Sequence, residues 1–345
     1  MTQLNLCERG NSYDKALTIS VAAYNVEKYL EKCLDSFCVP EIMKDIEVLI
    51  VNDGSTDRTA EIAAEYVAKY PATFILINKA NGGHGSTINT GIQAASGKYF
   101  KLVDADDWVE RDGVIQLVEI LKEQDVDAVL SPYYKVEAEN AKKTRIECYP
   151  VQAKSPNRKV ETKQMQRFWN PVMHAITYRT AILQKNFRPI DEHCFYVDVE
   201  YVVFYFRYIE NVLIADTPVY NYLVGTGGQS INMHNMVKRR EQHLRVCKRL
   251  LELLADPSCR QTAIQLIIKN CVVNHYRILM HIEDRKQSKM ELQKFDRYLK
   301  ACYPKIYRTA IAYGIRECQG MAIMVWTLRC LGFHCYGLLH RLIVK

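Results

Sequence analysis

The stretch Lys101-Leu-Val-Asp104-Ala-Asp106-Asp107-Trp108 decides how the rest of the chain is interpreted. An apolar, β-rich run ends here in three carboxylates within four residues. Carboxylates that repel one another at the end of a buried strand are costly to hold together. A shared divalent cation offsets that cost, and Mg²⁺ and Mn²⁺ prefer oxygen ligands. The alternative, from these residues alone, is an acidic, solvated turn that caps a helix beginning near Asp112.

Similar runs precede this strand along the chain. Apolar, β-branched segments occupy residues 17–22, 46–51 and 73–77, and residues at helical spacing follow them. Strands that alternate with helices of this length predict βαβ units and a mostly parallel sheet, so the predicted fold class is α/β. Ligands of such sheets bind beyond the carboxyl ends of the strands. Tyr24-Asn25, Asp53 and the Asp104–Asp107 segment all follow strands, so we expect them to converge on one rim.

The second half of the chain changes in character. Residues 137–167 are polar and Lys-rich and predict a loop or insertion, whereas the chain is expected to be helical from about Met236 onward. Residues 226–345 carry 21 Lys and Arg against 8 Asp and Glu, whereas the first 225 residues have an acidic balance. We therefore predict two domains, an α/β domain at 1–231 and a basic, mainly helical region at 232–345.

Composition narrows the class of protein. A chain of 345 residues that is 48% hydrophobic can bury a full core. Its first residues contain no apolar segment typical of a signal peptide, and the run Cys318–Leu328 is too short to span a bilayer. The twelve cysteines form no CxxC pair and no zinc-binding spacing. These features predict a cytoplasmic protein with reduced thiols.

Five motifs in order resemble the family 2 glycosyltransferases. They are AYN after the first strand, VNDGSTD after the second, NGGHG, Asn89-Thr90-Gly91 and VDADDW after the fourth strand, within residues 17–231. The resemblance implies the GT-A fold, in which a Rossmann-like sheet binds a nucleotide-sugar donor. It also implies transfer with inversion at the anomeric carbon, from a UDP-sugar to a hydroxyl of a glycan or lipid-linked glycan. Assembly of a bacterial surface polysaccharide is the setting it suggests.

The resemblance assigns roles to individual positions. Asp104 and Asp106 match the DxD motif, whose last Asp usually ligates the Mn²⁺ or Mg²⁺ that bridges the diphosphate. His84 either faces that diphosphate or only occupies a Gly-rich turn. The residues expected to bind the donor are Ala23, Tyr24, Asn25, Asp53, Asn81, Gly82, His84, Asn89, Asp104, Ala105 and Asp106.

Asp198 matches the family's general base, which takes the proton of the acceptor hydroxyl. Its neighbours Tyr196 and Tyr201 predict a half-buried carboxylate with a raised pKa, suited to that task. The alternative is a structural Asp that caps a helix over residues 199–208. Trp108 and His174 are candidates for acceptor binding, although a packed aromatic and a hydrogen-bonded core histidine are the ordinary interpretations of such residues.

Other functional classes are less consistent with the sequence. Gly83-His-Gly85 resembles part of a dinucleotide-binding fingerprint, but Ile88 interrupts it, and no GK[ST] follows for a P-loop. The main alternative is a non-catalytic protein whose basic helices bind a membrane surface or nucleic acid. A combined hypothesis is a transferase that binds the membrane and no nucleic acid, with Met321–Lys345 as an interfacial helix at the inner, anionic face of the membrane. Packing of the C-terminal helices on the catalytic domain, or a homodimer, would also account for them.

Overall fold

The structure is a computed structural model that describes residues 14–147, 157–165, 171–225, 233–256, 259 and 261–317. The chain divides into two compact units. The first contains Met1–Val160, Met173–Glu192 and Glu210–Val224, and the second contains Glu161–Val172, His193–Ile209 and Gly225–Lys345. Three segments of the predicted first domain, Glu161–Val172, His193–Ile209 and residues 225–231, therefore belong to the second unit. As a division of function, the boundary at residue 231 stays a prediction.

An eight-stranded sheet forms the first unit, in the order β3-β2-β1-β4-β10-β6-β11-β9. Its first four neighbours, all parallel, are β3 (Phe74–Asn78), β2 (Ile46–Asn52), β1 (Leu17–Ala23) and β4 (Tyr99–Asp104). The sheet continues through β10 (Ile176–Arg179), β6 (Ala128–Leu130), β11 (Asn211–Ile214) and β9 (Arg158–Glu161). Strand β10 runs antiparallel to both β4 and β6, so the sheet is mixed but mostly parallel. The predicted α/β class and GT-A-type architecture are confirmed.

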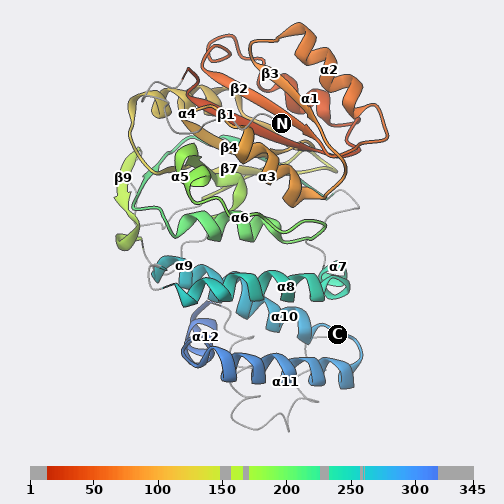
Figure 1. Ribbon diagram of the computed structural model, residues 1–345, viewed down its shortest axis with the longest axis vertical. Coiled ribbons are helices and arrows are strands. Elements are labelled where there is room, and N and C mark those ends of the chain that lie inside the picture. The colour runs from red at the N-terminus through yellow and green to blue at the C-terminus, as the bar shows by residue number, and fades with distance from the viewer. Residues whose placement is uncertain are drawn as a thin grey trace. The chain divides into compact units, whose positions relative to one another are not determined.

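Helices cover this sheet because the connections between its parallel strands are crossovers. They are α1 (Leu30–Asp35), α2 (Thr59–Lys69), α3 (His84–Ala94), α4 (Arg111–Glu123) and α5 (Thr180–Lys185), with a 3₁₀ turn at Met173–Ala175. Helices α3 and α5 pack side by side against β1 and β4 (Figure 1). Helix α3 begins at His84, because Gly83 has a φ of 81° and ends the extended turn there.

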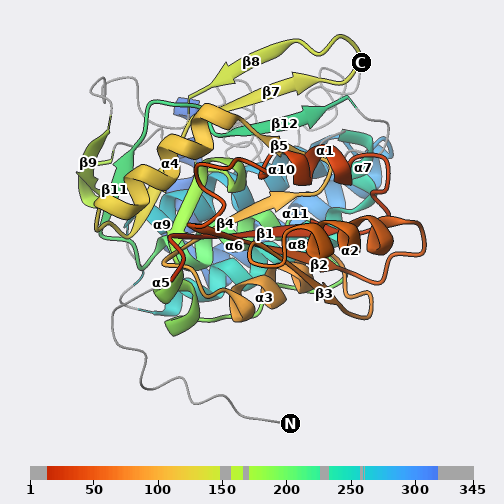
Figure 2. The same cartoon turned by 90° about the horizontal axis from the view of Figure 1, so that it is seen from above.

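A smaller four-stranded sheet has the order β5-β12-β7-β8, and its strands lie together in Figure 2. The strands are β5 (Trp108–Val109), β12 (Tyr220–Val224), β7 (Tyr133–Glu137) and β8 (Lys143–Ile146). The prediction of a loop or insertion at 137–167 is therefore wrong for its described parts, which contain β8, β9 and a 3₁₀ turn at Thr162–Gln164. Both strands are short, charged sheet edges, which carry little of the apolar alternation that identifies a strand.

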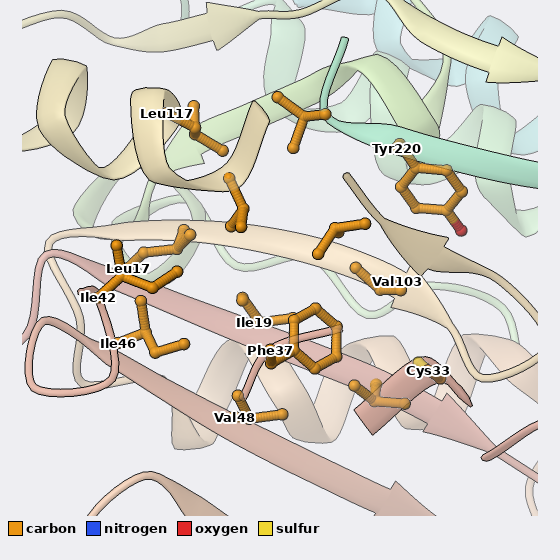
Figure 3. Packing of buried hydrophobic residues seen from close by; sticks show 14 of the residues in the cluster. Leu17, Ile19, Cys33, Phe37, Ile42, Ile46, Val48, Val103, Leu117 and Tyr220 are labelled. Atoms are coloured by element: carbon orange, nitrogen blue, oxygen red, sulfur yellow. The ribbon is translucent and has the colours of Figure 1, made fainter. Parts of the chain in front are cut away.

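The core of the first unit lies around β1 and β2. All seven residues of β2 are buried, as expected of a parallel strand covered on both faces. Figure 3 shows Leu17 and Ile19 of β1 close to Ile46 and Val48 of β2, with Phe37 packed among them. The strands that this core supports end in polar residues, Asn52 in β2 and Asp104 in β4.

The second unit is largely helical, as the spacing predicts. Its elements are α6 (Val197–Phe206), α7 (Met233–Lys238), α8 (Arg240–Leu251), a 3₁₀ turn (Glu252–Ala255), α9 (Gln261–Leu266), a π-helix (Ile267–Val273), α10 (Asn274–Met280), α11 (Arg285–Cys302) and α12 (Pro304–Glu317). The buried helix α6 carries Glu200, which is fully buried and accepts from Arg249 at 2.5 Å. Part of the basic charge therefore stabilises the unit itself.

No helix within the described part of the chain is both long and apolar enough to cross a bilayer. The interfacial helix predicted at Met321–Lys345 lies outside the described residues.

Candidate active site

The site is built at the carboxyl ends of β1, β2 and β4. Parallel pairing sets Ala22 of β1 opposite Asp104 of β4, and Ala23 opposite Asn52 of β2. The segments that follow these strands therefore lie side by side, as predicted from the sequence. Tyr24 follows the last residue of β1 and is 51% exposed. Ala23 and Ala105, in contrast, are almost fully buried.

Asp53 organises the glycine-rich turn. Its carboxylate accepts hydrogen bonds from the backbone N–H groups of Gly82 (2.9 Å) and Gly83 (2.8 Å), and from Lys79 Nζ (2.7 Å) and Ser86 Oγ (3.1 Å). Asn81 Nδ2 donates to the Asp53 backbone carbonyl at 2.9 Å. These hydrogen bonds offset the cost of burying the carboxylate of Asp53, which is only 1% exposed. Asp53 thus shapes the turn, and its direct role toward a donor stays a prediction.

Asn25 links the ends of β1 and β2. It has a left-handed φ of 51°, and its Oδ1 accepts from the Thr56 N–H at 2.8 Å. Its own N–H donates to Ser55 Oγ at 3.0 Å. Asn is among the residues that best tolerate this conformation. The residue therefore holds two rim loops together.

Asn89 serves mainly to pack α3. Its Nδ2 donates to the Ile190 carbonyl (2.9 Å), and its Oδ1 accepts from the Ile190 N–H (2.7 Å). Its amide thereby satisfies a neighbouring backbone segment. The structure thus gives Asn89 a packing function, while the predicted contact with the donor stays a prediction.

His84 points at the acidic cluster. Its Nε2 lies 3.1 Å from Asp104 Oδ1, which favours the first of the two interpretations of this residue, the one that places it in the site. Burial alone would raise the pKa of Asp104, but the charge and hydrogen bond of His84 outweigh it and lower that pKa. Asp104 is therefore held ionised.

The pKa values of the two neighbouring carboxyls, Asp106 and Asp107, are raised instead. Burial and the charge of Asp104 raise the pKa of Asp106 to about 6. Burial and the charges of Asp104 and Asp106 raise the pKa of Asp107 to about 9. Asp107 accepts from Tyr220 Oη at 2.6 Å and from the Leu223 N–H at 2.7 Å. Asp107 therefore keeps its proton at pH 7, and a bound cation would favour its ionised form.

His174 lies next to the acidic cluster, which the sequence did not indicate. One ring nitrogen of His174 and one oxygen each of Asp104 and Asp107 lie within 4.8 Å of one another. The expectation of a hydrogen-bonded core histidine is wrong, because Nδ1 and Nε2 are both buried and neither has a hydrogen-bond partner in the described residues. Aromatic rings instead surround the imidazole, with centroids of Tyr133, Tyr220 and Tyr222 at 5.5, 4.9 and 4.2 Å.

These residues fit a divalent cation. Burial lowers the pKa of His174 to about 4, so its ring is neutral at pH 7 and has a lone pair to offer. A buried imidazole without hydrogen bonds is unusual, and coordination would satisfy it. The group comprises Asp104, Asp107 and His174, whereas the metal role predicted for Asp106 stays a prediction. In the sequence, the consecutive Asp106-Asp107 pair could have indicated Asp107 as a metal ligand. No sequence pattern indicated that His174 joins the same group.

Trp108 and Asp198 differ from their expected surroundings. Lys32 Nζ lies 3.1 Å from the centroid of the Trp108 ring and covers one face of it. Asp198 belongs to the second unit, in the first turn of α6, and is exposed, whereas Tyr201 is buried. The expected burial of Asp198 is wrong, because the helix presents this position to solvent. Its role as a base and the acceptor role of Trp108 and His174 stay predictions.

A mostly parallel α/β sheet that ends in an acidic cluster defines the broad class, and comparison with known proteins defines the family. Residues 18–188 match the family model "Glycosyl transferase family 2". The glycosyltransferase EpsJ of Bacillus subtilis, itself uncharacterised, is 32% identical over 214 residues, which are 60% of each chain. The minor teichoic acid biosynthesis protein GgaB of the same organism is 32% identical over 133 residues, 38% of this chain and 15% of its own.

Among solved structures, S. aureus TarS 1–349 in complex with UDP-GlcNAc matches with a TM-score of 0.65 at 18% identity, over 91% of both chains. This likeness shows the fold. The chain belongs to glycosyl transferase family 2, which the resemblance in its motifs predicted. It spans less than two thirds of the length of the two curated relatives described above.

Proposed function

We propose that this protein is an inverting glycosyltransferase that moves a sugar from a UDP-sugar to a hydroxyl of a glycan or lipid-linked glycan. The observation that carries the proposal is the group of Asp104, Asp107 and His174 beyond the ends of the parallel strands. The TarS complex supports UDP as the nucleotide, since that protein binds UDP-GlcNAc on the same fold. The relation to GgaB supports a role in surface-polymer synthesis.

In this proposal the first unit binds the donor. The exposed ring of Tyr24 stacks on the uracil, while Asp53 holds the turn that borders the diphosphate. Asp104, Asp107 and His174 would hold Mn²⁺ or Mg²⁺, with Asp106 as a further carboxylate. The cation would stabilise the negative charge that develops on the diphosphate leaving group. His84 orients Asp104 through its 3.1 Å contact.

In the proposed transfer, one bond to the anomeric carbon forms as another breaks. The acceptor oxygen forms a bond to the anomeric carbon while the bond from that carbon to the diphosphate breaks, and the electron pair leaves with UDP. Asp198 takes the proton of the acceptor hydroxyl. Its exposure leaves it accessible to an acceptor.

Calorimetric titration of UDP with and without Mn²⁺ tests the donor site. We expect metal-dependent binding by the wild type, and a loss of at least about tenfold in affinity for Asp104→Asn and His174→Phe, because each removes a ligand. Asp106→Asn tests the DxD assignment in the same way. The matched control is Asp112→Asn, an exposed carboxylate at the start of α4. Equal affinity of all variants with and without metal would contradict the proposed site.

A further inference from the structure

Arg239, at the junction of α7 and α8, has no carboxylate partner in the described part of the chain, unlike several arginines of the same unit. Its neighbour Arg240 binds Glu291 through Nε at 2.9 Å and Nη2 at 3.0 Å. Arg207 binds Asp256 at 3.1 Å. Within the described residues, Arg239 Nη1 is buried and has no hydrogen-bond partner. A half-buried cation without a counterion is costly, so such a group is expected to meet an anion.

The Arg239 guanidinium rests on an aromatic platform. Its Cζ lies 3.5 Å from the centroid of the Phe195 ring, which is 40% exposed. The Phe195 N–H donates to Gln242 Oε1 at 3.0 Å, so α8 fixes the backbone of the platform. Stacking on a ring leaves the edge of a guanidinium available for a planar or tetrahedral oxyanion. The Phe195 ring thus supports one face of the Arg239 guanidinium, and the edge of the guanidinium can donate to an anion.

Tyr196 adds a second donor. It has a left-handed φ of 68° immediately before α6, a strained conformation for an aromatic residue. Its ring meets His243 edge-on at 4.9 Å, and its hydroxyl is buried without a hydrogen-bond partner among the described residues. Burial raises the pKa of Tyr196 to about 12, with Arg239 acting in the opposite direction, so the hydroxyl keeps its proton. Nη1 of Arg239 and the hydroxyl of Tyr196 are therefore two donors without an acceptor among the residues that the structure describes.

We propose that Arg239, Phe195 and Tyr196 form a subsite for an anionic group, a carboxylate or a phosphate, on the acceptor glycan. This inference rests on the proposed function, because it assigns the ligand to the acceptor through Asp198, which lies two residues after Tyr196. Arg239 and Tyr196 donate to the oxyanion, while Phe195 positions the guanidinium. The enzyme accordingly prefers a charged acceptor to a neutral one of the same ring structure.

Direct binding tests the subsite without relying on turnover. The probes are cellobiose, cellobiouronic acid and cellobiose 1-phosphate, titrated by calorimetry into the full chain, with UDP and Mn²⁺ binding measured separately. We expect Arg239→Gln to weaken one or both anionic probes by at least about tenfold and to leave cellobiose and UDP unchanged. The two anionic probes distinguish a carboxylate from a phosphate. Lys238→Gln, one residue away and exposed, makes the same charge change and should have no effect.

Two further variants keep the test independent of folding. Arg239→Lys retains the charge without the planar fork and should recover only part of the affinity. Phe195→Leu removes the ring but keeps an apolar side chain, and we expect an intermediate loss. Anionic probes that bind the wild type no better than cellobiose, an equal loss in Lys238→Gln, or a loss confined to UDP would overturn the subsite. Failure of UDP to bind any variant, with Arg239-dependent anion binding intact, would instead reject the transferase proposal alone.

Discussion

At the scale of single residues, neighbouring side chains set the ionisation and the position of the carboxyls in the acidic segment. Asp104 is kept ionised by His84, whereas Asp107 is hydrogen-bonded by Tyr220 and by the backbone of Leu223. Lys101, buried in the strand below, donates to the carbonyl of His174 at 2.9 Å and so fixes the backbone of that residue. The neutral imidazole and the ionised carboxylate are thereby brought within reach of one cation.

Gly85 lies where α3 packs against the 190–191 segment. A Cβ at this position would lie 1.9 Å from the carbonyl oxygen of Asp191, so Gly85→Ala must push the helix or the segment away. We expect a loss of about 2 kcal/mol in the free energy of unfolding by urea, together with weaker UDP binding, because His84 moves with the helix. Gln93→Ala, exposed on the same helix, is the control. Unchanged stability of Gly85→Ala would show that the contact relaxes freely.

At the scale of elements, the helices of the second unit pack around a pair of buried histidines. The rings of His243 in α8 and His275 in α10 stack at 5.2 Å with an interplanar angle of 5°, and their Nδ1 atoms are 3.1 Å apart. One Nδ1 must donate and the other accept, so at most one of the two rings can carry a proton on both nitrogens. Burial lowers the pKa of His243 to about 4 and that of His275 well below its ordinary value.

This pair makes stability depend on pH. In the unfolded chain each histidine takes up a proton near pH 6.5, whereas the folded pair resists protonation, so stability is lost as the pH falls from 6.5 toward 4. Because the pKa of His243 in the folded protein is about 4, this residue alone should cost about 2 kcal/mol of stability between pH 7 and pH 5. Urea unfolding at pH 7, 6 and 5 measures it, and His243→Gln should flatten the dependence. His281→Gln, on the surface, should retain the wild-type slope. Identical slopes in all three proteins would exclude the pair as the cause.

At the scale of the whole molecule, the two units contribute different parts of the proposed reaction. The first unit carries the residues assigned to the donor and metal, and the second carries Asp198 and the Arg239 subsite. Donor binding and proton removal should therefore respond to separate substitutions.

Asp198→Asn separates the two parts. We expect a fall of about 10²- to 10⁴-fold in the rate of sugar transfer, because the acceptor hydroxyl loses its base. Calorimetric UDP binding in the presence of Mn²⁺ should stay at the wild-type level. Glu192→Gln, an exposed acidic residue in the preceding segment, should leave both quantities unchanged. Full transfer activity in Asp198→Asn would remove this residue from the mechanism.

The sequence by itself determined the α/β class, the strands β1 to β4 and the convergence of Tyr24, Asp53 and Asp104 on one rim, because hydrophobic periodicity and motifs at strand ends are local signals. Only the tertiary structure brought His174 to Asp104 and Asp107, formed the four-stranded sheet from distant short strands, and left Asp198 exposed. These outcomes depend on which distant segments pair and how helices turn toward solvent. A single chain's local pattern does not record such long-range contacts, since the same residues could satisfy several pairings.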